Sequence, residues 1–290
     1  MRVAAICGQH GAMSVDTAHV TRPRTGFPFL DAGLDVPRSV LAFAHRGGAF
    51  HPELEGLENT MAAFQHAVDL GYQYLETDVH ATKDGHLLAI HDAFLDRVTE
   101  SRGAISELHR SEVAEALIGG KEQIPLLASL LEQFPDTRFN IDLKSDAAVD
   151  PLAELVQSMN AYDRVCIASF VHRRIERFRT LVGKRVATAA APFDVGLFRF
   201  LASTQIIDVL TRQRAAALQI PHRRGGVTIL TPGLVERAHA LGKHVHIWTV
   251  DDPEQMRELL DMGVDGLMTD RTDVLREVLI ERGQWMGAPR

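Results

Sequence analysis

Two pairs of charged residues with the same spacing are the first features of this sequence that could carry out chemistry. Glu76 and Asp78 lie within residues 75–92, LETDVHATKDGHLLAIHD, which otherwise has the apolar character of buried strands. Asp142 and Lys144 repeat that spacing in the segment FNIDLKS. Residues two apart on a β-strand point to the same face. Each pair is therefore predicted to present its charges to one side of a sheet.

The three carboxylates of these pairs are candidates for a cation site. Neighbouring strands lie about 4.8 Å apart, so Glu76, Asp78 and Asp142 reach a common point if their strands are adjacent. Carboxylates that close repel one another unless a cation lies between them. Three oxygen ligands without a cysteine suit a hard ion, Mg²⁺ or Ca²⁺, better than Zn²⁺. The alternative for each carboxylate is a solvated or salt-bridged strand end, but three together beside Lys144 favour the metal site.

Two of the 14 histidines stand out because each follows a predicted strand and has a charged neighbour. His45 occurs in HRG and His91 in HD, and a histidine pair beside a metal can transfer protons at neutral pH, one as base and one as acid. Alone, either histidine could be structural. The adjacent Arg46 either binds a phosphate or pairs with Glu58. Nine of the other histidines are predicted to be solvated on helices (His66, His109, His172 and His239) or on the outer face of a hairpin (His80 and His86), or are left undecided (His222, His244 and His246).

The charged residues are predicted to lie on a parallel sheet. From residue 40 onward, short apolar runs alternate with helical patterns, which is the rhythm of such a sheet. The first helix, residues 59–71, has apolar residues at helical spacing, Asn59 as its predicted N-cap and Gly71 at its end. Predicted strands occupy residues 41–47, 74–79, 138–145, 164–170, 185–190, 216–221, 244–250 and 266–270.

One apolar run, residues 86–92, does not fit the parallel order. It follows Asp84 and Gly85, a two-residue hairpin signal, whereas parallel neighbours need a crossover of about a dozen or more residues. We therefore predict a β-hairpin excursion after the second strand. The remaining eight strands are the number that closes an α/β (β/α)8 TIM barrel, in which functional residues lie where strands end. One domain is expected over residues 39–290, after an irregular N-terminal extension, residues 1–38, whose FPFL segment could plug one end of the fold.

Composition limits the classes of function. The 290 residues carry a formal net charge of −7, which argues against non-specific nucleic-acid binding. Only two cysteines occur, Cys7 and Cys166, so neither a disulfide framework nor a cysteine-based zinc site is expected. No apolar run approaches the roughly 20 residues needed to cross a bilayer, and the N-terminus has no continuous apolar signal segment. We expect a cytoplasmic protein without a nucleic-acid partner and without an integral membrane segment.

From about residue 41 to the C-terminus the sequence contains an ordered set of short motifs: HRG, EN, ExD, TKDG, HD, IPLL, FNIDLKS, IASF and WTV. This set resembles that of the glycerophosphodiester phosphodiesterase family, within the PLC-like phosphodiesterase TIM-barrel superfamily. The ordered set is far more specific than any single motif. The resemblance implies an enzyme of lipid and glycerol metabolism that hydrolyses glycerophosphodiesters (deacylated phospholipids) to glycerol 3-phosphate and an alcohol.

By position, the resemblance also implies roles for individual residues. Glu76, Asp78 and Asp142 would bind one divalent cation, Mg²⁺ or Ca²⁺. His45 and His91 would be the catalytic pair, and we assign His91 as the acid and His45 as the base. The nucleophile would be either water or the adjacent glycerol hydroxyl. Four further residues would contact the substrate or support the site: Arg46 and Lys144 at the phosphate, Glu58 behind the site and Trp248 at the glycerol moiety.

Two features depart from the family pattern, and two other functions are possible for the same barrel. Asp142 stands where the family usually has a glutamate, and the loop of residues 48–57, GAFHPELEGL, is longer than in many relatives. The main alternative is a lysophospholipase D-like phosphodiesterase acting on lysophospholipids, for which either the FPFL segment or residues 195–200, VGLFRF, could supply an apolar groove. A non-catalytic phosphate-binding barrel is less favoured, because both histidines, the three carboxylates and Lys144 are all present.

Overall fold

Eight parallel strands form the centre of the computed structural model, which describes residues 22–36, 38–212 and 214–287. Their order around the sheet is β8-β7-β6-β2-β1-β13-β12-β9, and a parallel bridge between Ala189 and Ala217 joins the two ends. The predicted TIM barrel is confirmed. The strands are β1 (Leu41–His45), β2 (Tyr74–Ala81), β6 (Arg138–Leu143), β7 (Val165–Ala168), β8 (Ala187–Thr188), β9 (Ala217–Ile220), β12 (His244–Ile247) and β13 (Gly266–Thr269).

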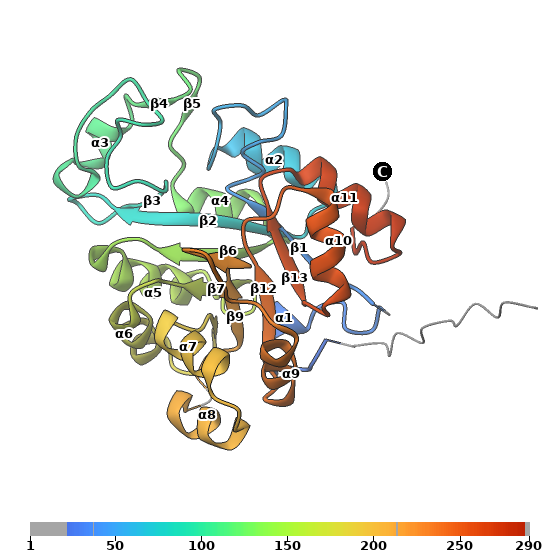
Figure 1. The fold of residues 1–290 in the computed structure, drawn as a ribbon. Helices are drawn as coiled ribbons and strands as arrows, with labels where there is room; N and C mark the ends of the chain where they lie inside the picture. The colour runs from blue at the N-terminus through green and yellow to red at the C-terminus, as the bar shows by residue number, and fades with distance from the viewer. Residues whose placement is uncertain (1–21, 37, 213, 288–290) are drawn as a thin grey trace, which may run out of the picture.

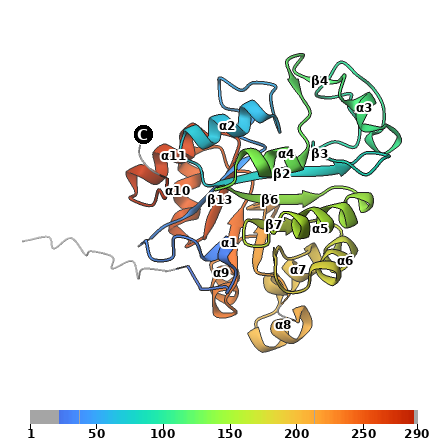
Figure 2. The same cartoon turned by 180° about the vertical axis from the view of Figure 1, so that it is seen from behind.

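Helices surround the barrel, as Figures 1 and 2 show from opposite sides. Most of them bury one apolar stripe, as α10 does with Met256, Leu259 and Leu260. Among the described residues, no helix is long and apolar enough to cross a membrane. The outer helices are α2 (Met61–Asp69), α4 (Leu127–Gln133), α5 (Val149–Ser158), α6 (His172–Val182), α7 (Pro192–Phe200), α8 (Thr204–Thr211), α9 (Pro232–Ala240), α10 (Pro253–Asp261) and α11 (Thr272–Glu281).

Helix α2 begins one residue later than its predicted cap implies. Thr60 is the N-cap, and its side chain accepts a hydrogen bond from the amide of Ala63, the usual role of a threonine at this position. Asn59 instead has a left-handed backbone with φ of 59°, which asparagine tolerates better than most residues. The prediction that Asn59 caps α2 was therefore wrong, and its side chain is used at the strand ends instead.

The excursion after the second barrel strand is confirmed. Strand β3 (Leu87–Ala89) pairs antiparallel with β2, with Ala81 opposite Leu87. Residues 82–86 join the two strands, and the predicted Asp84–Gly85 signal lies inside this connection. The chain then forms a small outer lobe, at the upper left of Figure 1, with a hydrophobic cluster of its own. Its elements are η1 (Ile105–Glu107), α3 (Arg110–Val113), β4 (Leu117–Ile118) and β5 (Glu122–Gln123).

The N-terminal segment covers one end of the barrel. Helix α1 (Pro28–Asp31) buries Phe29 and Leu30, and the Tyr74 hydroxyl donates a 2.7 Å hydrogen bond to the Phe29 carbonyl. Tyr74 is the first residue of β2, so the FPFL segment plugs the amino ends of the strands, opposite the ends where function is expected. Residues 1–21 of the predicted extension, Cys7 among them, lie outside the described residues.

Two histidines that the sequence left undecided are buried in β12. His244 and His246 have no exposed surface, and the ring of His246 packs against that of Phe43 with centroids 4.9 Å apart. Burial, and then the neighbouring His244, lower the pKa of His246 well below 6.5. The folded chain therefore holds His246 neutral inside the barrel.

His246 is expected to make the fold sensitive to acid. Below pH 6.5 the unfolded chain gains a proton on this ring that the folded chain does not bind. The free energy of unfolding should therefore fall with decreasing pH, by up to ~1.4 kcal/mol per pH unit for one group. His246→Gln removes the group, and we expect a shallower pH dependence between pH 6.5 and about 5. Denaturant titrations across this range measure it, with the exposed-site variant His109→Gln as control. Equal slopes in the two variants would contradict the prediction.

Candidate active site

The carboxyl ends of the barrel strands surround a cavity of about 420 Å³. Eight of the nine residues predicted for the site line it, and the ninth, Glu58, lies behind Arg46 at a hydrogen-bond distance of 3.2 Å. The barrel thus brings together side chains that are far apart in the sequence. The eight lining residues are His45, Arg46, Glu76, Asp78, His91, Asp142, Lys144 and Trp248.

The three predicted metal ligands lie on the neighbouring strands β2 and β6, with Asp78 opposite Asp142. All three are buried, and cationic side chains of the protein neutralise two of them. Lys144 Nζ lies 3.0 Å from Asp78 Oδ1 and 2.6 Å from Asp142 Oδ2. Arg46 Nε lies 3.1 Å from Asp78 Oδ2. Glu76 has no such partner nearer than His45 Nε2, at 3.8 Å.

The donor chemistry of the carboxylates fits a divalent cation, although their oxygens do not converge to within 4.8 Å as a set of three. Asp142 Oδ1 is buried and has no hydrogen-bond partner among the described residues. Buried carboxylate oxygens are the ligands that Mg²⁺ and Ca²⁺ prefer. Lys144 bridges Asp78 and Asp142, so binding of an ion by this set requires its ammonium group to move aside.

Burial and neighbouring charges make the three carboxylates electrostatically unequal. Burial, and then the charge of Asp78, raise the pKa of Glu76 to about 7, and burial also raises the pKa of Asp142. Burial acts in the same direction on Asp78, but Lys144 and Arg46 outweigh it and hold the pKa of Asp78 below its usual value. Burial is the first cause of both raised pKa values, and a cation bound between the carboxylates would oppose it by favouring their charged forms.

His45, at the end of β1, is held by a carboxylate that sequence reasoning did not assign. Its Nδ1 lies 2.8 Å from Oδ1 of Asp270, the residue after β13, and β13 pairs with β1 in the barrel. Burial lowers the pKa of His45, but Glu76 and Asp270 outweigh it and raise the pKa to about 9. The signal that could have found Asp270 is barrel closure, because closure places the end of the last strand beside the end of the first.

His91 reaches the cavity from the return strand of the hairpin. Its Nδ1 lies 2.6 Å from Asp92 Oδ1, and Asp92 pairs in turn with Arg97. His80 holds the backbone at this point, with its Nε2 3.1 Å from the carbonyl oxygen of His91. His80 is only 7% exposed, and burial lowers its pKa. The prediction that His80 lies on the outer face of the hairpin was wrong, because both faces of β2 are covered along its length.

The loop before α2 supports the cavity through two further side chains. Glu58 pairs with Arg46 at 3.2 Å and with Arg97 at 2.6 Å, so Arg46 has an ion-pair partner and also lines the cavity. Asn59 was not predicted here, and its Nδ2 donates a 3.3 Å hydrogen bond to Asp78 Oδ2. The EN motif therefore positions one residue behind the cation Arg46 and another against a candidate metal ligand.

Trp248 belongs to an apolar part of the cavity. Its ring packs edge to face against Phe170, with centroids 5.6 Å apart, and Val195, Phe200 and Ile220 also line the cavity. The cavity therefore combines a charged region with an apolar one, which suits a substrate that carries both a phosphate and an uncharged group.

Two histidines that were predicted to be solvated on helices are partly buried instead. The side chain of His239 is 16% exposed and its Nε2 lies 2.8 Å from Asp265 Oδ2. The side chain of His66 is 21% exposed and faces Glu53. Helical spacing identifies the face that packs on the barrel, but it does not show which loops pack over the remaining faces.

A closed parallel barrel with carboxylates, cations and histidines at its carboxyl end defines the class of (β/α)8-barrel enzymes. The sequence model of the Glycerophosphoryl diester phosphodiesterase family matches residues 45–274. The chain is 42% identical over 253 residues to a probable glycerophosphodiester phosphodiesterase 2 of Mycobacterium tuberculosis, covering 86% of this chain and 94% of that protein. It is 30% identical to the human lysophospholipase D GDPD1, covering 81% and 85%. A crystal structure of a putative glycerophosphoryl diester phosphodiesterase from Silicibacter pomeroyi matches with a TM-score of 0.74 at 22% identity, covering 89% and 99%.

The chain belongs to the glycerophosphoryl diester phosphodiesterase family, as its ordered motifs predicted. The family match begins at His45, the first of the two candidate catalytic histidines, and includes every predicted site residue. The protein is therefore a phosphodiesterase of the class that acts on glycerophosphodiesters.

Proposed function

We propose that this enzyme hydrolyses glycerophosphodiesters to glycerol 3-phosphate and an alcohol, with His45 and His91 as the acid–base pair. One divalent cation, Mg²⁺ or Ca²⁺, would be held by Glu76, Asp78 and Asp142. The observation that carries the proposal is that both histidines line one cavity with three buried carboxylates. A phosphodiesterase of Oleispira antarctica with the same fold, at a TM-score of 0.67 and 20% identity, was solved with the product sn-glycerol-3-phosphate.

Stabilisation of the transition state by positive charge in the cavity is the main contribution to catalysis in this proposal. A phosphodiester is a monoanion, and its transition state concentrates charge on oxygen atoms. Arg46 and Lys144 bring positive charges to that position, and such preorganised charge is usually the largest contribution to catalysis. A divalent cation, when bound, adds charge stabilisation and polarises a phosphoryl oxygen. Lys144, once it is no longer the counter-ion of Asp78 and Asp142, is free to contact the phosphate.

Proton transfer is assigned to the two histidines. Asp270 holds the Nδ1 proton of His45, and because the pKa of His45 is about 9, Nε2 must lose its own proton before it can accept one from the nucleophile, whether water or the glycerol hydroxyl. A cation bound beside Glu76 would favour this loss, because it would oppose the effect by which that carboxylate raises the pKa of His45. His91, oriented by Asp92, is the acid that protonates the oxygen of the leaving alcohol.

A panel of substrates with metal added back tests the proposal. The chain is stripped with a chelator, freed of it, and incubated with glycerophosphocholine, glycerophosphoethanolamine or glycerophosphoglycerol in Mg²⁺ or Ca²⁺. We expect glycerol 3-phosphate and the free alcohol in equal amounts from each substrate that is turned over. Release of glycerol and phosphocholine would contradict the assigned bond cleavage, and no turnover with either ion would contradict the substrate class.

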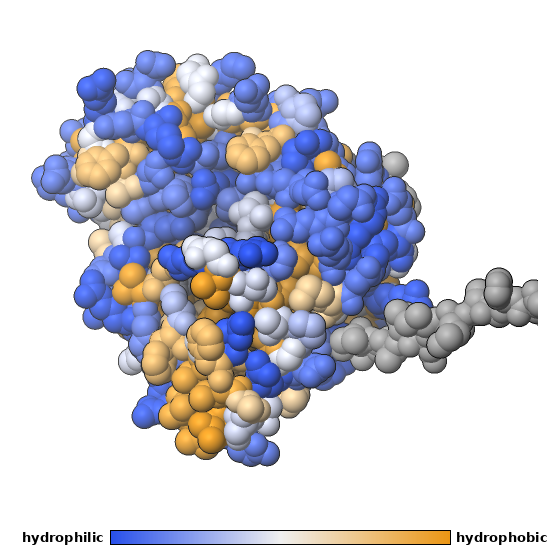
Figure 3. Space-filling model, in the orientation of Figure 1, coloured by the Kyte–Doolittle hydropathy of each residue, from blue (hydrophilic) through white to orange (hydrophobic). Residues whose placement is uncertain are grey.

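A second substrate class, lysophospholipids, is favoured by an apolar surface beside the cavity. Phe200 and Val195 line the cavity, and Phe200 is also 72% exposed, so the apolar wall continues onto the outer surface. Helices α7 and α8 form the orange region at the bottom of Figure 3, to which Phe193, Phe200, Ile206, Val209 and Leu210 contribute side chains that are 52–75% exposed. An acyl chain attached to the glycerol moiety would find apolar surface along this path.

Lysophosphatidylcholine, added to the same panel as dispersed monomers, distinguishes the two substrate classes. A higher kcat/KM for lysophosphatidylcholine than for glycerophosphocholine would favour the lysophospholipase D activity. The reverse order would mean that the apolar surface does not contribute to substrate binding.

A further inference from the structure

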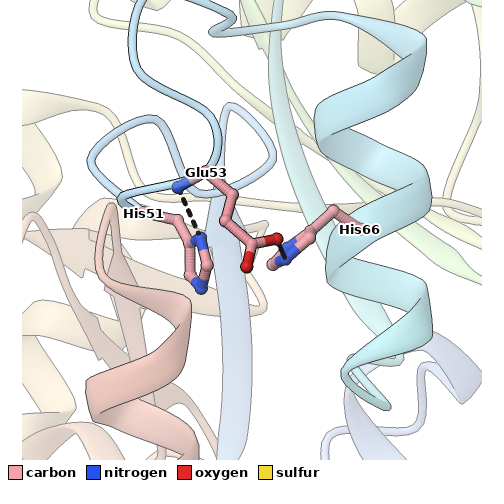
Figure 4. A group of neighbouring side chains, drawn as sticks. All are labelled: His51, Glu53 and His66. Atoms are coloured by element: carbon pink, nitrogen blue, oxygen red, sulfur yellow. Dashed lines mark hydrogen bonds and ion pairs between the residues drawn. The ribbon is translucent and has the colours of Figure 1, made fainter.

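A second cluster of metal-ligating side chains lies outside the cavity, where the loop between β1 and α2 packs on α2. It consists of His51 and Glu53 in the loop and His66 on the helix, and none of the three lines the cavity. Their donor atoms lie within 4.8 Å of one another, and the described residues contain no other such group of three. Figure 4 shows the carboxylate of Glu53 directed between the two imidazole rings.

The three side chains of the cluster need to move little to bind a metal ion. The two imidazole rings lie with centroids 4.2 Å apart, and His51 is only 9% exposed. Glu53 Oε2 lies 3.4 Å from His66 Nε2, and the Glu53 side chain is 75% exposed, so it can move without disturbing the core. Bond lengths of about 2.0–2.1 Å place the donor atoms of a tetrahedral Zn²⁺ about 3.3 Å apart. The cluster therefore needs to contract by ~1.5 Å at most, from a spacing of up to 4.8 Å.

The nitrogen atoms that would bind an ion are available. His66 Nδ1 is buried and has no hydrogen-bond partner among the described residues, so its ring can keep the proton there and direct the Nε2 lone pair at Glu53. A lone pair facing a carboxylate is repulsive unless a cation lies between them. His51 Nδ1 accepts a 3.2 Å hydrogen bond from the amide of Glu53, and no other partner of this atom is found among the described residues. Each ring therefore has a nitrogen atom that can turn to an ion with little rearrangement.

We propose that His51, Glu53 and His66 form a second metal site, which selects a transition metal ion such as Zn²⁺. Two imidazoles and one carboxylate are a donor set found in zinc sites that keep an open coordination position. Imidazole suits Zn²⁺, whereas an all-oxygen set suits Mg²⁺ or Ca²⁺. The loop cluster and the carboxylates of the cavity thus differ in the ion that each prefers.

An ion in this position would cross-link the loop to α2 beside the active site. The loop amide of Phe50 donates to the carbonyl oxygen of Asp270 at 3.0 Å, and the amide of Asn59 donates to that of Arg46 at 2.9 Å. A ligand that binds only the folded arrangement stabilises it. The second ion therefore has a structural role, in which it stabilises the loop that presents Glu58 and Asn59 to the cavity.

Zinc binding to the intact, chelator-stripped chain tests the proposal. Zn²⁺ is titrated calorimetrically with excess Mg²⁺ present, so that the carboxylates of the cavity are already occupied. The wild-type chain should bind one Zn²⁺ that the double variant His51→Ala/His66→Ala no longer binds. Glu53→Gln changes only an exposed side chain, and it should weaken this binding by at least about tenfold. The matched control, His86→Ala/His109→Ala, removes two exposed histidines and should bind Zn²⁺ as the wild type does.

Two results would overturn the second metal site. One is equal Zn²⁺ affinity and stoichiometry in the wild type, Glu53→Gln and the double variant. The other is a wild-type chain whose Zn²⁺ binding disappears only when His45 and His91 are replaced. Visible absorption of Co²⁺ provides a second measurement, since bands of a tetrahedral ion should appear in the wild type and be lost in the double variant. Thermal unfolding of the metal-free variants establishes that they are folded, and Glu53→Gln keeps the test decisive if the double variant is not.

Discussion

His45→Ala and His91→Ala should each lower kcat by about 10²–10⁴-fold, the usual contribution of a positioned acid or base. Both side chains line the cavity, and each has its Nδ1 anchored by a carboxylate, His45 by Asp270 and His91 by Asp92. Neither histidine supports the core, so the variants should fold normally. Initial rates of glycerol 3-phosphate release, measured at saturating substrate with far-ultraviolet circular dichroism as the folding check, give the result.

A matched control and a graded variant make this first prediction sharper. His109→Ala removes a histidine whose side chain is 51% exposed on the outer lobe, and it should leave kcat unchanged. Asp270→Asn keeps the shape of the partner of His45 but removes its charge, so it should lower kcat less than His45→Ala does. If a folded His45→Ala or His91→Ala enzyme kept more than about a tenth of the wild-type kcat, the replaced histidine would not be the acid or the base of the reaction.

Removal of divalent cations should abolish activity, and Mg²⁺ or Ca²⁺ should restore it. Without an ion, Lys144 is tied to Asp78 and Asp142, at 3.0 Å and 2.6 Å, and is not available to the phosphate. Metal ions contribute several kcal/mol of transition-state stabilisation, and each ~1.4 kcal/mol is a factor of ten in rate. A loss of at least about 10³-fold in kcat is therefore expected. Rates are measured in excess chelator and again after dialysis into each ion.

Variants of Asp142 and of the loop cluster show which of the two sites holds the ion that is required for activity. Asp142→Asn should raise the Mg²⁺ concentration needed for half-maximal activity, whereas Asp142→Glu, which supplies the residue usual in the family, should retain activity. The chelator should inactivate His51→Ala/His66→Ala as fully as it does the wild type. Full activity of the wild type in excess chelator would rule out the ion at the carboxylates. If the loop variant were inactive even with Mg²⁺ or Ca²⁺ present, while the Asp142 variants responded to metal as the wild type does, the required ion would lie in the loop cluster.

The barrel itself was predictable because its signals are local. Buried parallel strands are continuous apolar runs and the helices between them have a period of about 3.6 residues, so the strands and most helices are visible in short windows. Glu76 and Asp78 were assigned to one face because side chains alternate along a strand. The hairpin excursion was predictable from chain length, since no crossover fits between β2 and β3. The N-cap of α2 was missed because asparagine suits both a cap and a left-handed residue, and only the backbone conformation distinguishes the two.

The sequence by itself determined the fold class, the family and the residues that gather at the carboxyl ends of the strands, because strand alternation and motif spacing are properties of neighbouring residues. Only the tertiary structure decided which distant side chains pair. Barrel closure sets Asp270 beside His45, although they are 225 residues apart. The hairpin sets the carbonyl oxygen of His91 against the ring of His80 and so turns a predicted surface histidine into a support for His91. Packing of the loop on α2 brings His51 and Glu53 to His66. Contacts between separate elements depend on how whole elements pack, and no short pattern of residues encodes that.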